Sequence, residues 1–508
     1  MKSIVILYES NSKFGDEKSF NGKSAKELCE SKVSKLDLEI VKIPHQKNLI
    51  SLLTAIKNAG KEKQADYVIF SFDDLPFYNE SLSQKMRKTH EEYKAEYTFA
   101  DGYPYGYSPE IIDCGALGIL EEMAATNHKE IGDKPVERDS IYNLLKTEIN
   151  NFEVEAVLAD GDYRLLRLAF HTGKKENYLS SLALFNKAGD MEDCEKLSEI
   201  ASKTPEVLKT VPGFYNIQLA DYVSNNAIYS PYNGAYEKLN CLSPLKSNKV
   251  MAYEDFSRLI DKIAAFSDTA VVSLSAWGEP FAHKDILKMV EKVLSYEGLS
   301  VFIETDGTLI TEETAKQLEL IRNNAAQRTN GWDKLMIAVA LDGVTENMYK
   351  TVHNNCNEDD FNKALASVTL LSAHIPGSVY PQFTRMNENE SELESFFRYW
   401  NEKTNCTGGN FIINKYDDFA GLLPQRKPAD LSPIERDPCW HIRRDMTILT
   451  NGDVPLCRAY VLSNIQGNAF RAPLEDIWAK LNNTLKEHID KKYNEKCGKC
   501  DEYYTFNF

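Results

Sequence analysis

Long apolar runs are missing from this sequence of 508 residues. No stretch approaches the roughly 20 apolar residues that a membrane-spanning helix needs, so we expect no membrane partner. The N-terminus carries one lysine and a short apolar run that stops at Glu9, without the longer apolar core and cleavage site of an export signal. We therefore expect a cytoplasmic protein whose first residues form a β-strand.

A surplus of positive charge is also absent. The sequence has 76 acidic and 59 basic residues, and its formal net charge is -17 at pH 7. A chain of this charge repels phosphate backbones and anionic bilayers. We therefore expect no nucleic-acid partner.

Cysteine is scarce, and its distribution is uneven. Ten cysteines in 508 residues are too few for a disulfide-stapled secreted protein. Six are isolated along the chain and are expected to be buried, unreactive thiols: Cys29, Cys114, Cys194, Cys241, Cys356 and Cys406. The other four are Cys439, Cys457, Cys497 and Cys500. In a reducing compartment such grouping favours a metal site over disulfides.

The length of the chain predicts about three domains of roughly 150 residues each. From residue 3 to about residue 203, strand and helix patterns alternate, which predicts an α/β layer with a parallel, Rossmann-like sheet. The expected elements are strands at 4–8, 38–43 and 67–72 and a helix at 49–59.

Two carboxylates follow the third of these strands. The strand 67–72 is apolar on both faces and ends at Asp73 and Asp74. This position lies at the carboxyl edge of the sheet, where open α/β sheets bind ligands. Such a pair suits Mg2+ that holds a nucleotide phosphate. The alternative is that one aspartate only caps the next helix.

A second alternation of strands and helices runs from about residue 206 to residue 430. Apolar strands are expected at 215–219, 271–274, 301–304, 335–340, 379–383 and 410–413, with helices at 253–266, 286–296, 312–323 and 390–400. Six such repeats predict an incomplete (β/α)6 barrel of the TIM type, with its site at the carboxyl ends of the strands. We therefore expect domains at 1–205, 206–430 and 431–508.

The last domain holds the four grouped cysteines in the spacing C-x17-C-x39-C-x2-C. Asn451-Gly452 predicts a tight turn that joins strands 446–449 and 454–457 in a β-hairpin, with Cys457 on the second strand. Gly498 lets the chain curl so that Cys497 and Cys500 can face one metal. Four thiolates suit a 4Fe-4S cluster or a structural zinc ion, and the spacing alone leaves both open.

Several motifs of these two domains resemble the radical-SAM superfamily and its SPASM auxiliary-cluster domain. Residues 278–280 resemble the loop that holds the amino group of S-adenosylmethionine, and the turn at 305–307 resembles that family's Thr-Asn-Gly turn. The order of the four tail cysteines, with Gly-Asn at 467–468 and the helix start at 474–478, resembles SPASM. The resemblance implies that Gly278, Glu279, Pro280 and Asp306 bind S-adenosylmethionine, and that Cys439, Cys457, Cys497 and Cys500 bind one iron-sulfur cluster.

The defining element of the radical-SAM superfamily is missing. Val223, Ala227 and Ser230 stand where its C-x3-C-x2-C cysteines belong, just after the first barrel strand. Without three thiolates, no cluster can bind there and cleave S-adenosylmethionine reductively. We therefore expect no radical-SAM activity of the usual type.

The first domain resembles the nucleotide-diphospho-sugar transferases, especially cytidylyltransferases, at residues 67–76, 97–104 and 158–166. This resemblance implies Mg2+ and nucleotide binding, with Asp73, Asp74 and Asp160 as metal ligands. The usual glycine-rich nucleotide loop is replaced by residues 9–15, which lack consecutive glycines. The three pieces together resemble the spiro-SPASM proteins of spirochaetes.

Three hypotheses follow. The first is a cluster-binding scaffold that has lost its radical-generating cluster and recognises a protein or peptide partner, or a small nucleotide-like ligand. The second is a metal-dependent nucleotidyltransferase in the first domain. The third is a redox or zinc-structural metalloprotein without a substrate. The S-adenosylmethionine pocket has its own alternative, in which Trp277 fills the space and Glu279 only packs a loop.

Overall fold

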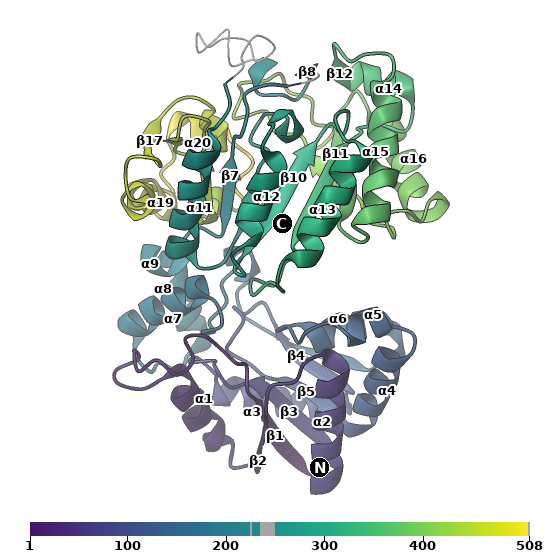
Figure 1. Cartoon of the computed structure of the whole chain (residues 1–508). Helices are drawn as coiled ribbons and strands as arrows, with labels where there is room; N and C mark the ends of the chain where they lie inside the picture. Colours follow the sequence, from purple (N-terminus) through teal and green to yellow (C-terminus); the bar gives the residue numbers. More distant parts are fainter. Residues whose placement is uncertain (224–225, 234–248, 506–508) are drawn as a thin grey trace. The chain divides into compact units, whose positions relative to one another are not determined.

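The computed structural model describes residues 1–223, 226–233 and 249–505 (Figure 1). The chain divides into two compact units, Met1–Thr210 and Val211–Phe508. Within the described residues, every helix is too short or too polar to cross a bilayer. Each unit is an α/β layer structure, which confirms the predicted fold class.

The first unit is built on a sheet with the strand order β2-β1-β3-β5-β4-β6. Its strands are β1 Ser3–Tyr8, β2 Ile40–Ile43, β3 Tyr67–Phe72, β4 Tyr97–Asp101, β5 Glu110–Asp113 and β6 Val154–Leu158. β1, β2 and β3 are parallel, as predicted. β5 is antiparallel to both of its neighbours, which corrects the prediction of a parallel sheet. The loop between β4 and β5 is too short for the crossover that parallel strands need.

Helices of the first unit follow the amphipathic pattern of the sequence. They are α1 Ala25–Val33, α2 Leu49–Lys63, α3 Glu80–Tyr93, α4 Cys114–Ala125, α5 Lys129–Gly132, α6 Ser140–Lys146, α7 Lys175–Ala188, α8 Cys194–Lys203 and α9 Pro205–Leu208. α1 begins at a capping box, in which the Ser24 side chain accepts from the Glu27 amide and the Glu27 side chain accepts from the Ser24 amide. β1 and β3 are buried along their whole length, so this core fixes the strand ends that follow.

The second unit is built on a sheet with the order β14-β13-β11-β10-β9-β7-β15. Its strands are β7 Phe214–Ile217, β9 Ala270–Ser273, β10 Leu299–Thr305, β11 Leu335–Ala340, β13 Val379–Arg385, β14 Ile412–Lys415 and β15 Asp445–Ile448. Every pair in this sheet is parallel. The six strands from β7 to β14 are those predicted for the incomplete barrel, which is thereby confirmed.

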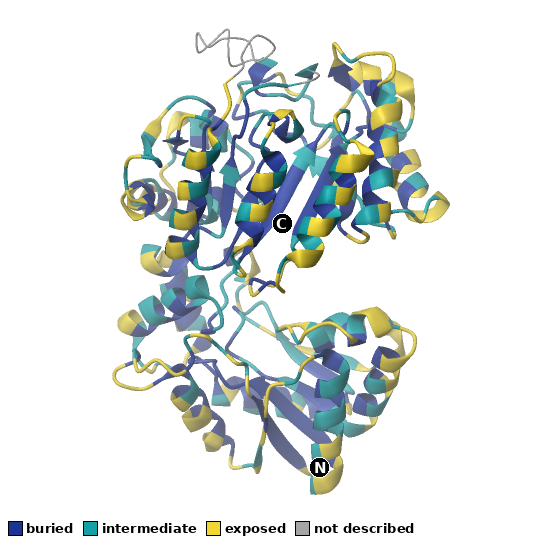
Figure 2. Ribbon diagram, in the orientation of Figure 1, coloured by how far each residue is buried: buried dark blue, intermediate teal, exposed yellow. Residues whose placement is uncertain are grey.

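Helices line one face of this sheet (Figure 1). They are α11 Tyr253–Ser267, α12 Ile286–Leu294, α13 Glu312–Asn324, α14 Glu346–Val352, α15 Asp360–His374 and α16 Leu393–Arg398. Figure 2 shows the strands buried and the helices striped, with buried and exposed residues alternating along each helix. The pattern is that of amphipathic helices packed on a buried parallel sheet. Functional side chains are therefore expected on the loops after each strand.

The tail of the chain contributes to the same sheet. β15 pairs with β7 and provides hydrogen-bond partners for the backbone along the outer edge of β7. The Asn451-Gly452 turn forms, with Gly452 at φ +85°, but β16 (Asp453–Pro455) pairs with β17 (Ile465–Asn468) rather than with β15. The Leu449 amide donates to the Asp453 carbonyl next to the turn, as the hairpin predicts, but the predicted pairing of strands 446–449 and 454–457 does not extend further. The helices of the tail are α17 Trp440–Arg444, α18 Leu474–Lys480, α19 Asn482–Ile489 and α20 Glu495–Lys499.

Candidate functional site: the tail cysteines and the barrel mouth

The four tail cysteines lie at the ends of short elements. Cys439 precedes α17, and Cys457 follows β16 rather than lying on a strand, at the start of a 3-10 turn, Arg458–Tyr460. Cys497 lies inside α20, and Cys500 is the residue after this helix ends. All four are free thiols. Loop and cap positions of this kind let side chains turn toward a common site without disturbing a strand ladder.

The surroundings of these thiols favour their neutral form. Burial raises the pKa of Cys439 to about 11 and that of Cys457 to about 12. Burial also raises the pKa of Cys497 and Cys500, and the charges of Cys439 and Cys457 raise that of Cys500 further. The thiols are thus close enough for their charges to interact. A bound metal would favour the thiolate forms instead.

The ligand assignment itself remains a prediction. In residues 1–223, 226–233 and 249–505, no group of three or more His, Cys, Asp and Glu side chains is arranged to hold a metal ion. The donor set of four thiols from three separate segments is the feature that fits an iron-sulfur cluster or a zinc ion.

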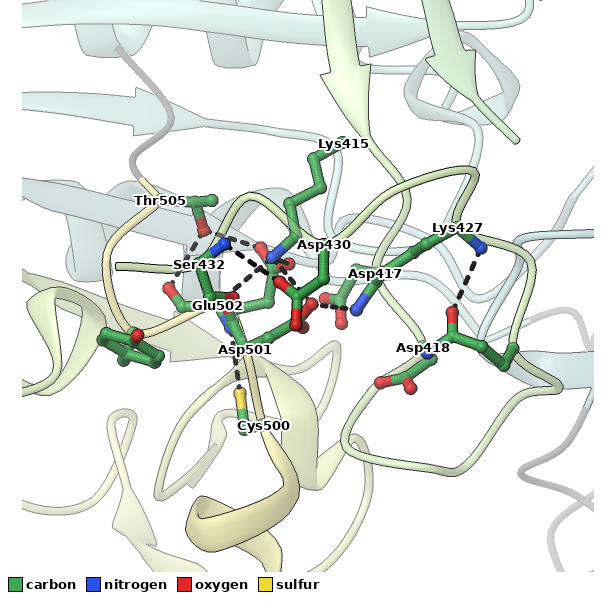
Figure 3. Close-up of polar contacts among 12 residues, drawn as sticks. Lys415, Asp417, Asp418, Lys427, Asp430, Ser432, Cys500, Asp501, Glu502 and Thr505 are labelled. Atoms are coloured by element: carbon green, nitrogen blue, oxygen red, sulfur yellow. Dashed lines mark hydrogen bonds and ion pairs between the residues drawn. The ribbon is translucent and has the colours of Figure 1, made fainter. Parts of the chain in front are cut away.

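The segment after Cys500 is tied to the end of β14 (Figure 3). The Lys415 ammonium donates to the Asp501 carbonyl at 2.8 Å and to Glu502 Oε1 at 2.9 Å. The Glu502 amide in turn lies 3.4 Å from Cys500 Sγ and donates to it. Hydrogen bonds of this kind to a ligand sulfur orient the ligand and tune a bound cluster. Sequence analysis missed Lys415 because no spacing relates it to a cysteine 85 residues away.

The loop after β7, where the radical-SAM cysteines would lie, is fastened to the barrel. Ala227, in the short strand β8 (Asn226–Ala227), pairs with His353 of β12 (His353–Asn354). The Tyr229 hydroxyl donates to Asp342 Oδ2 at 2.9 Å, and His353 Nε2 lies 3.0 Å from the same oxygen. Asp342 and His353 are buried. This loop is held by hydrogen bonds and ion pairing of the chain itself.

The predicted S-adenosylmethionine loop packs against the same segment. A Cβ added at Gly278 would lie 1.8 Å from the Ala220 carbonyl oxygen, so only glycine fits there. The Glu279 amide donates to the Tyr222 carbonyl at 2.8 Å. Pro280 begins a one-turn 3-10 helix, Pro280–Ala282. The backbones of the two loops are therefore in direct contact.

Glu279 and Asp306 meet at the carboxyl ends of β9 and β10. Glu279 Oε2 accepts from the Asp306 amide at 3.0 Å, and Glu279 Oε1 accepts from the Thr305 hydroxyl and the Phe281 amide at 2.9 Å each. Burial, and then the charge of Asp306, raise the pKa of Glu279 well above its usual range. Burial also raises the pKa of Asp306. Both Glu279 oxygens are engaged by the chain, and ligand binding by residues 278–280 and Asp306 remains a prediction.

An apolar cluster occupies the loops at the carboxyl ends of the barrel strands. Its buried members are Val352, Met386, Tyr416, Phe419, Leu423 and Val461. Trp277, Ile228 and Tyr229 pack against it. Trp277 has φ +60°, in the left-handed region that non-glycine residues rarely adopt. Trp277 is thus part of the packing around this cluster, and its filling of the S-adenosylmethionine pocket stays a prediction.

The aspartates predicted in the first unit occupy different environments. Asp74 is fully buried, and both its oxygens accept from Arg138, at 2.6 and 2.8 Å. Burial alone would raise the pKa of Asp74, but the charge and hydrogen bonds of Arg138 hold it well below its usual range. Asp160 is exposed, and it follows β6, three strand positions from β3 in the sheet. Three strand spacings correspond to about 14 Å, so the sheet does not bring Asp160 close to Asp74.

Asp73 borders a pocket of about 540 Å³ at the carboxyl ends of β1 and β2. Its Oδ1 accepts from the Ser10 amide at 3.0 Å and from the Ser10 hydroxyl at 2.7 Å. Its Oδ2 lies 4.0 Å from Lys26 Nζ. Burial raises the pKa of Asp73. The lining is rich in charged groups: Glu9, Asp16, Lys18, Lys26, Glu27, Glu30, Lys42, His45 and Asp73. Sequence analysis missed Lys26 and His45, because neither belongs to a motif.

The isolated cysteines follow their prediction in part. Cys29 and Cys194 are buried, whereas Cys114, Cys356 and Cys406 are only partly so. Cys241 lies outside the described residues.

Comparison with known proteins identifies the tail. Residues 439–501 match the SPASM family, described as an iron-sulfur cluster-binding domain. The match includes all four tail cysteines, from Cys439 to Cys500. Residues 439–501 of this chain are therefore a SPASM-type segment, from a family whose description is iron-sulfur cluster binding.

Two solved structures are similar to parts of this chain. Streptococcus suis SuiB bound to its precursor peptide SuiA is 15% identical, with a TM-score of 0.42, over 76% of this chain and 84% of that one. A cytidylyltransferase from Leptospira borgpetersenii is 14% identical, with a TM-score of 0.35, over 41% of this chain and 97% of that one.

A relative of high similarity spans most of the sequence. An uncharacterized protein of Treponema pallidum (strain Nichols) is 38% identical over 376 residues, which are 72% of this chain and 98% of that protein. The chain therefore belongs to the same protein family as this Treponema pallidum protein.

Proposed function

We propose that this protein is a cluster-binding scaffold in which Cys439, Cys457, Cys497 and Cys500 hold one 4Fe-4S cluster and the half-barrel recognises a protein or peptide partner without generating radicals. A bound cluster would supply one-electron transfer. The chain's own residues supply four thiols and the hydrogen bonds that orient their loops. S-adenosylmethionine is not required for this role.

One observation supports this proposal above the others: thiols are present in the tail and absent from the three positions after β7 where the radical-SAM cysteines would lie. The SPASM match contains four free cysteines. Val223, Ala227 and Ser230 offer no thiolate after β7, and Tyr229 in that loop is bonded to Asp342. Cluster iron in proteins is held mainly by cysteine thiolates, and this favours the tail over the loop after β7 as the place of a cluster.

Anaerobic purification followed by iron, sulfide and zinc analysis tests the cluster. The wild-type chain is expected to contain about four irons and four sulfides, and Cys497→Ala is expected to lose most of both. Stoichiometric zinc without sulfide would indicate that the cysteines hold a structural zinc ion instead of a cluster. In a parallel incubation with S-adenosylmethionine and a strong reductant, formation of 5'-deoxyadenosine would contradict the non-radical role.

The scaffold role needs its own test. The tagged, purified holoprotein is mixed with a lysate of its source cells and cross-linked. The captured protein is identified, purified and then titrated against the wild type. Saturable binding that is unchanged when Cys497→Ala removes the cluster would place recognition on the half-barrel. Binding that disappears with the cluster would place it on the tail.

As a second candidate, we propose nucleotide binding at the pocket beside Asp73, which its position at the carboxyl edge of β1 favours. Mg2+ at Asp73 and a phosphate near Lys26 suit this pocket. With a sugar or sugar-phosphate acceptor present to take the cytidylyl group, CTP-dependent pyrophosphate release is expected from the wild type and is expected to be lost in Asp73→Asn. No turnover with any nucleoside triphosphate would remove this candidate.

A further inference from the structure

The C-x2-C loop is fastened by one arginine that no cysteine motif contains. Arg436 Nη2 donates to the Cys497 carbonyl at 2.6 Å and to the Cys500 carbonyl at 2.5 Å. Arg436 Nη1 lies 3.4 Å from the Gly498 carbonyl and donates to it. One planar guanidinium therefore contacts three carbonyls of the segment that carries two of the four predicted ligands.

These carbonyls lie at the carboxyl end of α20, where the Cys497 carbonyl also accepts from the Cys500 amide at 3.3 Å. The last carbonyls of a helix have no partner within it, and they carry the negative end of the helix dipole. α20 is a single short helix whose other end is capped by the Asn494 side chain, which accepts from the Cys497 amide at 2.9 Å. Arg436 caps its carboxyl end with a positive charge. The backbone around both thiols is thus held at its two ends.

Aromatic rings hold the arginine itself. The guanidinium carbon lies 4.7 Å from the Tyr493 ring centroid and 4.3 Å from that of Tyr503, distances at which cation-π attraction contributes. The Tyr503 carbonyl accepts from the Trp440 amide at 2.8 Å, next to Cys439. Arg436 thereby links the C-x2-C loop to the segment of a third ligand.

From this geometry we infer that Arg436 is a positioning residue for the cluster: it holds the backbone of the Cys497–Cys500 loop, which carries two of the four predicted ligands, in place before the metal arrives. The inference rests on the proposed function, since it concerns the same four thiols. Lysine cannot take this role fully, because its ammonium lacks the planar fork that reaches three carbonyls. Loss of a residue that orients metal ligands typically lowers metal affinity by about 10- to 100-fold.

The test compares Arg436→Met, Arg436→Lys and a matched control, Arg471→Met, which removes an exposed arginine from the same domain. Each full-length holoprotein is exposed anaerobically to an iron chelator, and the loss of cluster absorbance is followed. The expected rates of loss are unchanged for Arg471→Met, about 10-fold or more faster for Arg436→Met, and intermediate for Arg436→Lys. Circular dichroism and melting of the metal-free forms check that the variants fold.

A signature of the cluster separates positioning from general stability. The reduction potential and the electron paramagnetic resonance spectrum of the remaining cluster are expected to change in Arg436→Lys and to stay unchanged in Arg471→Met. Equal chelation rates and spectra in Arg436→Lys and wild type would overturn the inference while leaving the cluster in place. A wild type without iron or sulfide would overturn the proposed function as well.

Discussion

The sequence suggests metal ligands in both units, and the two sets of side chains have different surroundings in the folded chain. In the first unit, Asp74 is paired through both oxygens with Arg138. In the second unit, the four tail cysteines are free thiols in surroundings that raise their pKa. A carboxylate that already has a buried arginine gains little from a metal, whereas uncharged buried thiols gain a partner when one binds. We therefore expect a metal at the tail thiols rather than at Asp74.

The prediction with the largest expected effect concerns the tail cysteines, and its failure would contradict this comparison. Cys457→Ser is expected to abolish nearly all cluster binding, because it removes one of four thiolates. Cys406→Ser, at a partly buried cysteine outside the tail group, is expected to keep the wild-type iron and sulfide content. Metal and sulfide analysis of both variants measures the effect. Similar content in the two would show that the tail thiols are not the ligands.

A second prediction concerns Asp74 as a structural rather than a metal-binding group. Asp74→Asn leaves Arg138 without its buried counter-charge, which is expected to destabilise the chain by about 3–5 kcal/mol. Asp160→Asn, at an exposed position, is expected to change the free energy of unfolding by less than about 0.5 kcal/mol. Urea unfolding with and without Mg2+ measures both. Equal stability of the two variants, or a Mg2+ dependence lost only in Asp74→Asn, would restore Asp74 as a ligand.

The loop after β7 provides a third, smaller effect. Tyr229→Phe removes the hydroxyl that donates to buried Asp342. The expected loss of stability is about 1–3 kcal/mol, the cost of leaving a buried acceptor with one partner fewer. Tyr253→Phe, at the start of α11, serves as the control. If chemical denaturation gives the same midpoint for both variants, the loop is not held by this contact.

A fourth prediction is a pH dependence in the first unit. Burial raises the pKa of Glu110 to about 8, and its Oε2 has no hydrogen-bond partner. The folded chain therefore keeps a proton that the unfolded chain releases, and stability should fall as pH rises from about 4.5 to about 8. Glu110→Gln is expected to flatten this part of the curve. Melting temperatures of the wild type and of Glu110→Gln across this pH range test the prediction, and parallel curves would contradict it.

Much of the fold could be predicted from the sequence, since strands with apolar runs and helices with a clear period were recognised close to their ends. β3 and β11 match their predicted ranges. β15 could not be recognised as a barrel strand, because its partner β7 lies 231 positions earlier in register, from Phe214 to Asp445, and pairing over such a distance leaves no local pattern. The antiparallel β5 was missed for a similar reason.

The site was predictable only where one residue type carries the signal. Cysteine spacing marks Cys497 and Cys500 directly. The sequence holds no comparable signal for Arg436, Lys415 and Arg138, because each contacts a segment that is far away in the sequence. Arginine and lysine are also common on protein surfaces, so their positions alone indicate no site. The engagement of Asp74 by Arg138 is likewise a property of the folded chain alone.

The pairing of β15 with β7 has a consequence for how this protein can be divided. A chain cut before Asp445 would lose Cys457, Cys497 and Cys500 together with the strand that covers the β7 edge. Bare edges of this kind recruit strands from other molecules and promote aggregation. The cysteine-bearing segment, expressed alone, would carry an orphaned strand of its own. Neither fragment is a faithful substitute for the intact polypeptide, so deletion experiments on this family are best replaced by point substitutions.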